Sequence, residues 1–582
     1  MILDKNLPDR DKARKICEEL DRLAAERKNF EGTWQEAQEL VSSVTLSFNA
    51  TEGESTEGFN IPKRITNRPA NYQETLIDGV CGYGVNPNIT WMKLGLADQE
   101  VMKSYGVKDW LEAVEHAEYE EFDNSNLYTE IKMVVEQATT FGFGIMHVED
   151  DLVNNRTRYK QINVPEVFLD TNEYNEYETV FRRFYMTVEN TVSRFGIDKM
   201  HQSIKDRWNS VDNGTQRAKE IEIIHAVFRR KSRKGVSERN TDMPFASYFV
   251  DRANSHIIME SGYRSFPYAI FAWDRRGGKK YPVSPAIKAI NDVKLLHKTE
   301  DTRLTLAQMA ARQPMAVPET MRKANEMFGK DGYIKPGAII YYDAADKTVP
   351  AGINMGGNYP ITLDITKQMA DNIKDWFFVD FFLMLQQQNI GQMTATAVQA
   401  LQGEKATVMT NMIVNLKKAL HVVVQRTYDI MSRQGRLPDI PAVLMQPGGQ
   451  EGNRMQFTFA SVLSQLQQAA LRYQGAQQFL PVAHSVAQLG GAYPPALEAL
   501  DRFDFDIILQ NEARAAHMPE TAIREDDDVK GMQERRAQAA AMQAQQNAQM
   551  QQQQLAAQNY NKLNEPVKPG TPAAAMFGGG AA

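Results

Sequence analysis

The sequence has few cysteines and no long apolar run, and each of these shortages excludes a class of protein. Only two of its 582 residues are cysteines, Cys17 and Cys81, which excludes a disulfide framework or a cysteine zinc site and predicts a reducing cytosol. The most apolar run, Trp376 to Leu385, is interrupted by Asp380 and is far shorter than the ~20 residues that span a bilayer. The N-terminus lacks the apolar core of a signal peptide. We therefore expect no membrane segment.

Enzyme motifs are also missing. A phosphate-binding P-loop needs a glycine five positions before a Gly-Lys pair and Ser or Thr after it, but the pair at Gly278 is followed by Lys280 and the pair at Gly329 by Asp331. The nine histidines lack metalloprotease spacing, and no Gly-x-Ser-x-Gly elbow occurs. The sequence predicts a protein that is not an enzyme and holds no cofactor and no catalytic metal.

One acidic group leaves a nuclease alternative open. Glu525 and the three aspartates at 526–528 could ligate Mg²⁺, and such a nuclease would lose Mg²⁺-dependent DNA cleavage when Asp526 to Asp528 were replaced by Asn. Adjacent residues on a helix point in different directions. The favoured interpretation is therefore a charge cluster at a helix N-terminus, where the helix dipole stabilises carboxylates.

Length and charge are those of a soluble protein with several packing units. Single cores stop growing near ~250 to 300 residues, so 582 residues predict several subdomains. Hydrophobic residues make up 42% of the chain and charged residues 24%, as in ordinary globular proteins. The net charge of -7 argues against a protein that grips nucleic acid over its whole surface, so any DNA contact is regional.

Residues 1–283 read as an α+β body. Helices are predicted from Arg10 to about Ala25, from a capping box formed by Thr33 and Glu36, and over 72–80, 109–123 and 127–140. The acidic stretch 109–123 is interpreted as a solvated face. Alternating patterns predict strands from Trp91 and over 144–149, 159–164, 179–186, 220–229 and within 245–273.

After the body, the pattern predicts two long helices with a small insert between them. The first occupies 284–312, with Pro285 in its first turn, and stops before Pro314. The insert, 313–360, is rich in Gly and Pro, and Ile339 to Tyr342 is its clearest strand. The second helix covers 361–385. A third begins at Thr394 or Thr396 and ends at Gly435, with an apolar seam formed by Val398, Leu401, Val408, Met412, Leu416, Ala419, Val423, Thr427 and Ile430.

The second helix carries apolar residues at strict fourth positions. A spacing of four drifts by about 40° per step on a 3.6-residue helix, so the stripe winds around the cylinder and needs neighbours on several sides. Burial of seven such side chains is worth roughly 10 to 20 kcal/mol gross. We therefore predict that this helix packs against other copies of the chain. The predicted oligomer-packing residues are Ile365, Met369, Ile373, Trp376, Phe377 and Phe381.

In the order and spacing of these elements, residues 10 to 535 resemble the portal, or head-to-tail connector, proteins of short-tailed bacteriophages. The residues that carry the resemblance are Trp34 with its helix, the stretch from Phe266 through Pro285 to Leu296, Gln313 to Pro318, Met393 to Thr396, and Arg426 to Pro438. One departure is Ala397, which stands where the family's Thr-Ala-Thr sequence is usually followed by an acidic residue. Thr396 and Gln399 form a capping box there instead.

The resemblance implies a multidomain portal-type fold that assembles as a dodecameric ring. It implies a wing (1–283), a stem (284–312 and 361–385), a clip (313–360), a tunnel loop (386–393), a long wing helix (394–435) and a wing and crown region (436–530). Such a ring sits at the capsid vertex of the virion after assembly in the host cytoplasm. Its implied partners are double-stranded DNA passing through the channel, a terminase ATPase, a tail adaptor, and capsid and scaffolding proteins.

The link between the second and third helices offers amides and no charge: Gln386, Gln387, Gln388, Asn389, Ile390, Gly391 and Gln392. Neutral amides can touch phosphates without trapping them, whereas each lysine contact adds a counterion-release contribution to DNA affinity. We expect this loop to form the channel constriction, and the alternative is a plain connecting loop. The first stem helix and its end carry five basic residues against three acidic ones, and Lys294, Lys298 and Arg303 are expected to line the channel.

The last part of the chain differs in composition. Residues 531–582 begin with an Ala-, Gln- and Met-rich segment, which favours a helix, and end in a Pro-, Gly- and Ala-rich tail that predicts disorder. The competing hypothesis for the whole chain is a scaffolding or tail adaptor protein without a DNA channel. That protein would form rings or filaments in which the glutamine loop is buried or absent from the axis.

Overall fold

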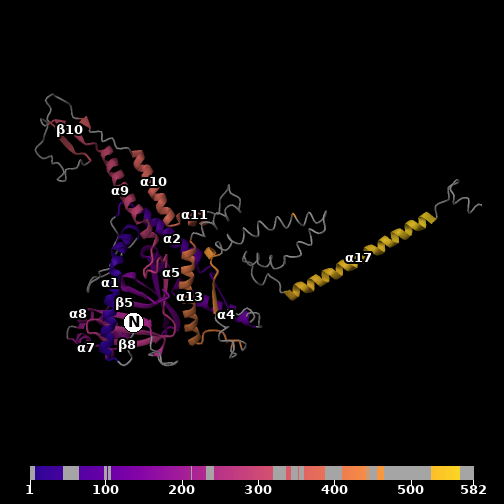
Figure 1. Ribbon diagram of the computed structural model, residues 1–582, viewed down its shortest axis with the longest axis horizontal. Coiled ribbons are helices and arrows are strands. Elements are labelled where there is room, and N and C mark those ends of the chain that lie inside the picture. The colour runs from indigo at the N-terminus through magenta and orange to yellow at the C-terminus, as the bar shows by residue number, and fades with distance from the viewer. Residues whose placement is uncertain are drawn as a thin grey trace, which may run out of the picture. The chain divides into compact units, whose positions relative to one another are not determined.

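The computed structural model describes residues 7–42, 64–96, 101, 106–210, 213–230, 242–318, 336–342, 351–352, 359–386, 409–441, 444, 455–464, 485 and 526–563. It divides into two compact units, Met1–Gln474 and Gly475–Ala582. In the second unit, the described structure is dominated by one helix, α17 (Asp526–Leu563). Figure 1 shows the order of the elements.

The first unit has a mixed body of helices and sheets, which confirms the predicted α+β class. Its main helices are α1 (Asp9–Val41), α2 (Arg68–Gly84), α4 (Val107–Asn124), α5 (Leu127–Phe141), α6 (Val188–Phe195), α7 (Gln202–Trp208), α8 (Asn213–Arg217) and α13 (Thr410–Arg433). Its strands are β1 (Met92–Leu96), β2 (Phe143–Asp151), β3 (Arg156–Ile162), β4 (Val167–Thr171), β5 (Tyr177–Thr187), β6 (Glu220–Arg229), β7 (Phe245–Asp251), β8 (His256–Tyr263), β9 (Tyr268–Ala272) and β13 (Met455–Phe459).

Three antiparallel sheets organise the body. The largest has the order β4-β5-β6-β7-β8, in which each strand pairs with its neighbour in the chain. A second sheet has the order β3-β2-β9. The third pairs β1 with β13, so that Met92 lies opposite Phe459 although the two are far apart in the sequence.

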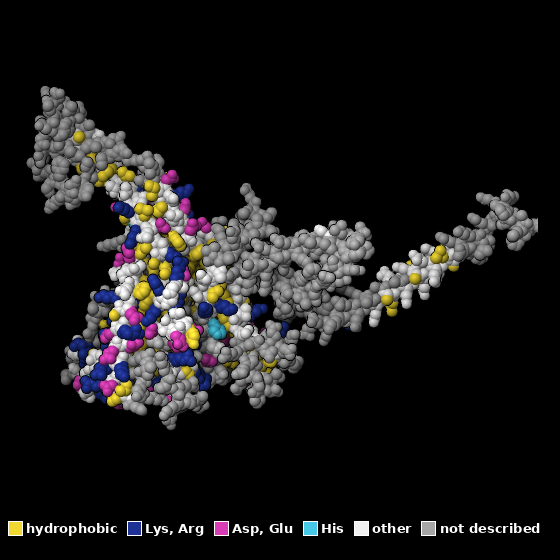
Figure 2. Space-filling model, in the orientation of Figure 1, with side chains coloured by type: hydrophobic (Ala, Val, Ile, Leu, Met, Phe, Trp, Pro, Cys, Tyr) yellow, Lys and Arg dark blue, Asp and Glu magenta, His cyan; other side chains and the backbone are white. Residues whose placement is uncertain are grey.

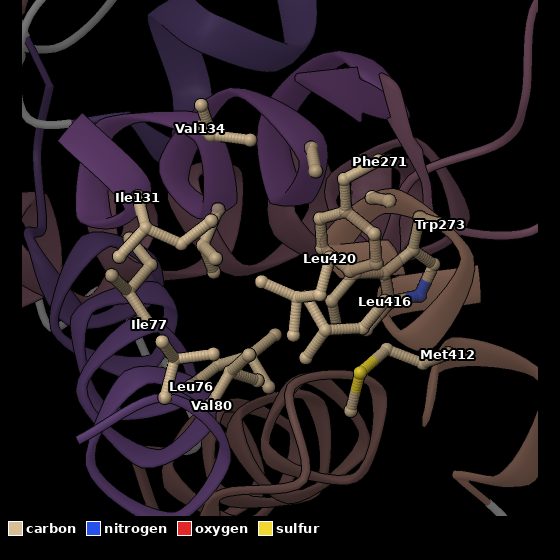
Figure 3. Close-up of a cluster of buried hydrophobic side chains, with 14 of the residues drawn as sticks. Leu76, Ile77, Val80, Ile131, Val134, Phe271, Trp273, Met412, Leu416 and Leu420 are labelled. Atoms are coloured by element: carbon tan, nitrogen blue, oxygen red, sulfur yellow. The ribbon is translucent and has the colours of Figure 1, made fainter. Parts of the chain in front are cut away.

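The main core lies where α2, α5 and α13 meet β9. Figure 3 shows apolar side chains from these elements that point toward one another. Its labelled residues are Leu76, Ile77, Val80, Ile131, Val134, Phe271, Trp273, Met412, Leu416 and Leu420. Helix α13 thus lies at the centre of the unit. The structure describes six residues of the predicted apolar seam, from Met412 to Ile430, and all six are buried. The described part of the seam is therefore confirmed.

Helix α13 begins at Thr410 and ends near the predicted Gly435. Gly435 follows the helix with a φ of 67°, a left-handed conformation that glycine adopts without steric cost. The predicted starts at Thr394 and Thr396 lie outside the described residues.

Helix α1 differs from the prediction. It runs unbroken from Asp9 to Val41, so the capping box predicted at Thr33 is wrong, and Thr33 is an exposed residue inside the helix. Arg27 explains the continuity. Its side chain is 1% exposed and donates hydrogen bonds to the carbonyls of Val164 (3.3 Å), Pro165 (2.8 Å) and Val167 (2.7 Å). This tertiary contact stabilises the segment that local signals had marked as a break.

The acidic helix α4 is not simply a solvated face, so that interpretation is corrected. Glu118 is 0% exposed and Glu121 5%, because both lie on the side of the helix that packs on α13 and β3. Glu121 accepts hydrogen bonds from the Arg436 guanidinium and from the backbone N–H of Thr157. Glu118 has no hydrogen-bond partner for either carboxylate oxygen among the described residues. The Glu121 carboxylate therefore has hydrogen-bond partners within the fold, whereas the Glu118 carboxylate has none among the described residues.

Ser284 joins the body to the next helix. Its hydroxyl accepts a hydrogen bond from the backbone N–H of Ile287 at 2.9 Å and donates one to the carbonyl of Thr140 at 2.8 Å, and the side chain is 0% exposed.

We expect Ser284→Ala to lower the free energy of unfolding by about 1 to 2 kcal/mol, because it removes a helix N-cap and leaves a buried carbonyl unpaired. Urea denaturation measures this loss. The matched change at exposed Ser193 in α6 should cost less than about 0.5 kcal/mol, and equal losses would contradict the capping role.

Candidate functional site

Two helices extend from the body and form the candidate site. Helix α9 (Pro285–Ala311) and helix α10 (Tyr359–Trp376) pack against each other, and Figure 1 shows them leaving the body side by side. We call this pair the stem. The predicted first helix, 284–312, is confirmed, with Ser284 as its N-cap and a stop before Pro314.

A small sheet lies at the far end of the stem. Strand β10 (Met315–Pro318) pairs in parallel with β11 (Ile339–Tyr342) and antiparallel with β12 (Ala351–Gly352). The strand predicted at Ile339 to Tyr342 is therefore confirmed. The described part of the insert is a three-stranded module between the two stem helices.

Part of the stem belongs to the core, whereas other positions carry apolar side chains in solvent. On α9, Ala286, Ala289, Val293 and Leu296 are buried, but Leu295 is 44% exposed and Leu304 is 52% exposed. Figure 2 shows hydrophobic side chains along the stem among charged ones. The large exposed apolar residues of the two stem helices are Leu295, Leu304, Leu363, Ile365 and Trp376. Such exposed apolar side chains are candidates for a protein contact.

The second stem helix is not continuous, so the prediction of one helix over 361–385 is wrong. Helix α10 ends at Trp376, and a separate helix, α11 (Val379–Gln386), follows. Between them Phe378 has a φ of 53°, a left-handed conformation that costs energy for a bulky residue. The turn lets Phe382 pack on α2, where a Cβ on Gly79 would lie 2.2 Å from the Phe382 ring. Close packing against α2 thus outweighs the helical preference.

The predicted packing residues divide into two groups. Ile373, Phe377 and Phe381 are 0%, 0% and 2% exposed and lie in the core of their own subunit. Burial inside one chain removes them from any contact between subunits, which corrects that part of the prediction. Ile365 and Trp376 are 38% and 42% exposed, and Met369 is partly buried against the core.

The prediction missed the exposed residue Leu363, which is not one of the apolar residues at fourth positions. Leu363 is 47% exposed, although it lies only two positions before Ile365. The residues of the strict stripe from Ile373 to Phe381 are the ones that the chain buries within itself, whereas Ile365 in the same stripe is exposed.

The basic residues predicted to line a channel all lie on α9, with different partners. The Lys294 ammonium lies 2.5 Å from a carboxylate oxygen of Glu36 on α1, and the Arg303 guanidinium lies 2.7 Å from Glu300. Lys298 is exposed and forms no ion pair with a described residue. The Lys294–Glu36 pair is exposed on both sides and contributes about 0 to 1 kcal/mol, whereas in the Arg303–Glu300 pair the carboxylate is buried.

The stem helices carry no net charge. Four basic and three acidic residues of α9 stand beside two basic and three acidic residues of α10. The small positive excess expected for the first stem helix is therefore balanced by its neighbour. Screened over a Debye length of about 8 Å, such a surface attracts DNA phosphates weakly.

The predicted constriction falls almost entirely outside the described residues. Gln386 is the last residue of α11, and Gln387, Gln388, Asn389, Ile390, Gly391 and Gln392 lie beyond it. In the acidic group of the nuclease alternative, Asp526 to Asp528 begin α17, Glu525 lies outside the described residues, and none of the four side chains is described. Among the residues whose side chains the structure places, no group of three or more His, Cys, Asp or Glu is arranged to hold a metal ion.

The described helices include none with an apolar stretch long enough to cross a membrane.

Comparison of the sequence with known proteins supports the resemblance to portal proteins. A family model described as "Bacteriophage head to tail connecting protein" matches residues 13–523.

Two curated relatives match over most of their length. The "Portal protein" of Salmonella phage epsilon15 is 28% identical over 560 residues, which cover 95% of each chain. The "Probable portal protein" of Bordetella phage BPP-1 is 26% identical over 496 residues, which cover 83% of this chain and 84% of the relative. The match to the family model spans most of the chain, and the chain therefore belongs to the portal, or head-to-tail connector, family of bacteriophage proteins.

Proposed function

We propose that twelve copies of this chain form a closed ring at the capsid vertex, whose channel passes double-stranded DNA during genome packaging and ejection. The observation that carries the proposal is the exposed apolar surface of the stem. Five large apolar side chains there are 38% to 52% exposed, and each contributes roughly 1.5 to 3 kcal/mol when it is fully buried. A head-to-tail contact that closes on itself satisfies such a surface in every copy.

The stem surface also suits the inner wall of a DNA channel. Its balanced charges do not hold phosphates tightly, because tight binding needs a cluster of unpaired lysines and arginines. Lys298 is the one predicted channel residue with no ion pair among the described residues, and we propose that it faces the DNA together with Lys294 and Arg303. The uncharged loop Gln386 to Gln392 forms the constriction in this proposal. A ring structure in which that loop faced bulk solvent outside the channel would contradict it.

The partners follow from this role. The far end of the stem, with strands β10, β11 and β12, is the proposed docking site for the terminase ATPase and later for the tail adaptor. Capsid and scaffolding proteins contact the body in the proposed assembly, which takes place in the host cytoplasm. The motor activity belongs to the terminase, and this chain supplies the passage.

Leu363→Asp tests the proposed interface. The exposed leucine makes no large contribution to its own subunit, so the variant should fold but fail to assemble, because the contact would bury an unpaired carboxylate. We expect the sedimentation coefficient to fall to that of a single chain, and negative-stain images to lack the annular particles that we expect for the unchanged protein.

Leu152→Asp is the matched control, because Leu152 is an 81% exposed leucine on the body. It should assemble as the unchanged protein does. Intact rings from Leu363→Asp would contradict a stem interface. Rings or filaments of the unchanged protein without a central hole would favour a scaffolding or adaptor protein that has no channel.

A further inference from the structure

A cavity of about 620 Å³ opens between the two larger sheets of the body. Its wall is formed by strands of both sheets and by helix α6. The side chains that matter here are His147, Lys160, Arg182, Arg194, His225 and Tyr268. None of them belongs to the stem or to the proposed channel, so the cavity has no part in the proposed function.

Strand register places these residues in two facing rows. In the β3-β2-β9 sheet, Lys160 pairs with His147 and His147 with Tyr268. In the five-stranded sheet, Arg182 pairs with His225. The rows are linked where the Tyr268 hydroxyl and His225 Nδ1 lie 2.9 Å apart. Each row therefore ends in a cation on the same side of the cavity, and the pKa of Lys160 is lowered by burial and by nearby Arg182.

The imidazoles between these cations are neutral. His147 is 6% exposed and His225 is 3% exposed, and burial holds the pKa of both rings well below the ordinary value. A neutral imidazole keeps one N–H donor and adds no charge. His225 already engages both ring nitrogens, with Ser247 and with the Tyr268 hydroxyl, so the floor of the cavity is polar and uncharged, and the charged side chains of the wall decide what it can bind.

The carboxylates at the cavity wall already have partners. Glu130 accepts hydrogen bonds from the Asn126 side chain and from the backbone N–H of Gln161. Glu149 forms an ion pair with Arg194. Asp150 contacts Gln434 and Arg433, and Asp151 contacts Asn154 and Arg156. Arg182 is likewise paired, with Glu166 at 2.7 Å. Lys160 forms no ion pair within the described part of the chain. Outside these ion pairs, Glu130, whose partners carry no charge, leaves one negative charge at the wall, and Lys160 and Arg158 leave two positive ones, so the remaining charge is weakly positive.

We propose that this cavity binds a small phosphorylated anion, with the Lys160 ammonium as its principal charged contact and Arg182 and Arg194 beside it. An oxyanion with several acceptor atoms suits donors that approach from two sheets and a helix, because charge-assisted hydrogen bonds to phosphate are about twice as strong as neutral ones. Occupation of the cavity would join the two sheets through one ligand.

Pyrophosphate binding to the full-length assembled protein tests the proposal. Thermal unfolding is followed as pyrophosphate rises at constant ionic strength, and calorimetry gives the affinity directly. We expect a saturable rise in the unfolding temperature, since a ligand that binds only the folded state stabilises it. Lys160→Gln should weaken the affinity at least tenfold. Lys199→Gln, a matched change at an exposed lysine outside the cavity, should leave it unchanged.

Three outcomes would overturn the proposal. The first is the absence of saturable binding to the unchanged protein. The second is equal affinity in Lys160→Gln and Lys199→Gln, which would mean non-specific ionic attraction. The third is Lys160-dependent binding of a short DNA duplex without binding of pyrophosphate, because the site would then recognise phosphates of nucleic acid and not a small anion.

Discussion

Phe377→Ala is expected to lower the free energy of unfolding of the subunit by about 3 to 5 kcal/mol. Phe377 is 0% exposed and packs in the main core together with Ile373 and Phe381. Its removal leaves a cavity in the core at the turn between α10 and α11. Urea denaturation, at a concentration where the chain is a single copy, measures the loss.

Its neighbour Trp376 provides the control. This side chain is 42% exposed, and its indole N–H donates to Asp292 at 3.2 Å on the stem surface. Trp376→Ala should cost less than about 1 kcal/mol in the single chain and should instead weaken ring assembly in sedimentation experiments. Equal losses of subunit stability in the two variants would contradict the assignment of Phe377 to the core and Trp376 to the interface.

Glu118→Met is expected to raise the free energy of unfolding by about 1 to 3 kcal/mol, which is the penalty for a buried polar group without a partner. The side chain is 0% exposed. Burial raises the pKa of Glu118 well above its ordinary value of 4.5, and Glu115 on α4 and Asp429 on α13 raise it further. Tyr159 on β3 and Tyr428 on α13 also face this carboxyl.

The same shift makes the effect depend on pH. Above about pH 4.5 the unfolded chain loses the Glu118 proton while the folded chain keeps it. The unfolded state then binds fewer protons, so the contribution of Glu118 to stability falls as pH rises toward the raised pKa. The advantage of Glu118→Met should therefore be small at pH 4.5 and grow toward pH 8, as measured by urea denaturation at each pH.

Glu112→Met is the matched control for this second result. Glu112 is exposed on the same helix, so the same substitution there should change stability by less than about 0.5 kcal/mol, without the rise in advantage at high pH. A pH-independent gain in Glu118→Met would mean that only the added apolar contact matters.

Elements whose signals are local were predicted well. The start of α9 at Ser284 and Pro285 and the end of α13 at Gly435 depend on helix capping, which involves only residues at the helix end itself. The strand over 220–229 matches β6 (Glu220–Arg229), because a bounded β-rich run needs no distant partner to be recognised. These elements are the frame on which the candidate site is built.

Errors arose where a distant contact outweighed a local signal. Thr33 and Glu36 have the spacing of a capping box, but α1 continues through them because Arg27 binds carbonyls more than a hundred residues away. Phe378 lies in a run typical of a helix, yet the chain turns there so that Phe382 can pack on Gly79. Neither partner is visible from the local pattern.

The amino-acid sequence by itself determined the family, the α+β class, the limits of the first stem helix and the apolar seam of α13. Periodicity and caps suffice for these features because each depends on residues within a few turns of one another. Only the tertiary structure decided which side of α10 is buried, because the stripe at fourth positions winds around the helix. Docking of α11 on α2 buries Phe377 and Phe381 within the chain and leaves Leu363, Ile365 and Trp376 exposed.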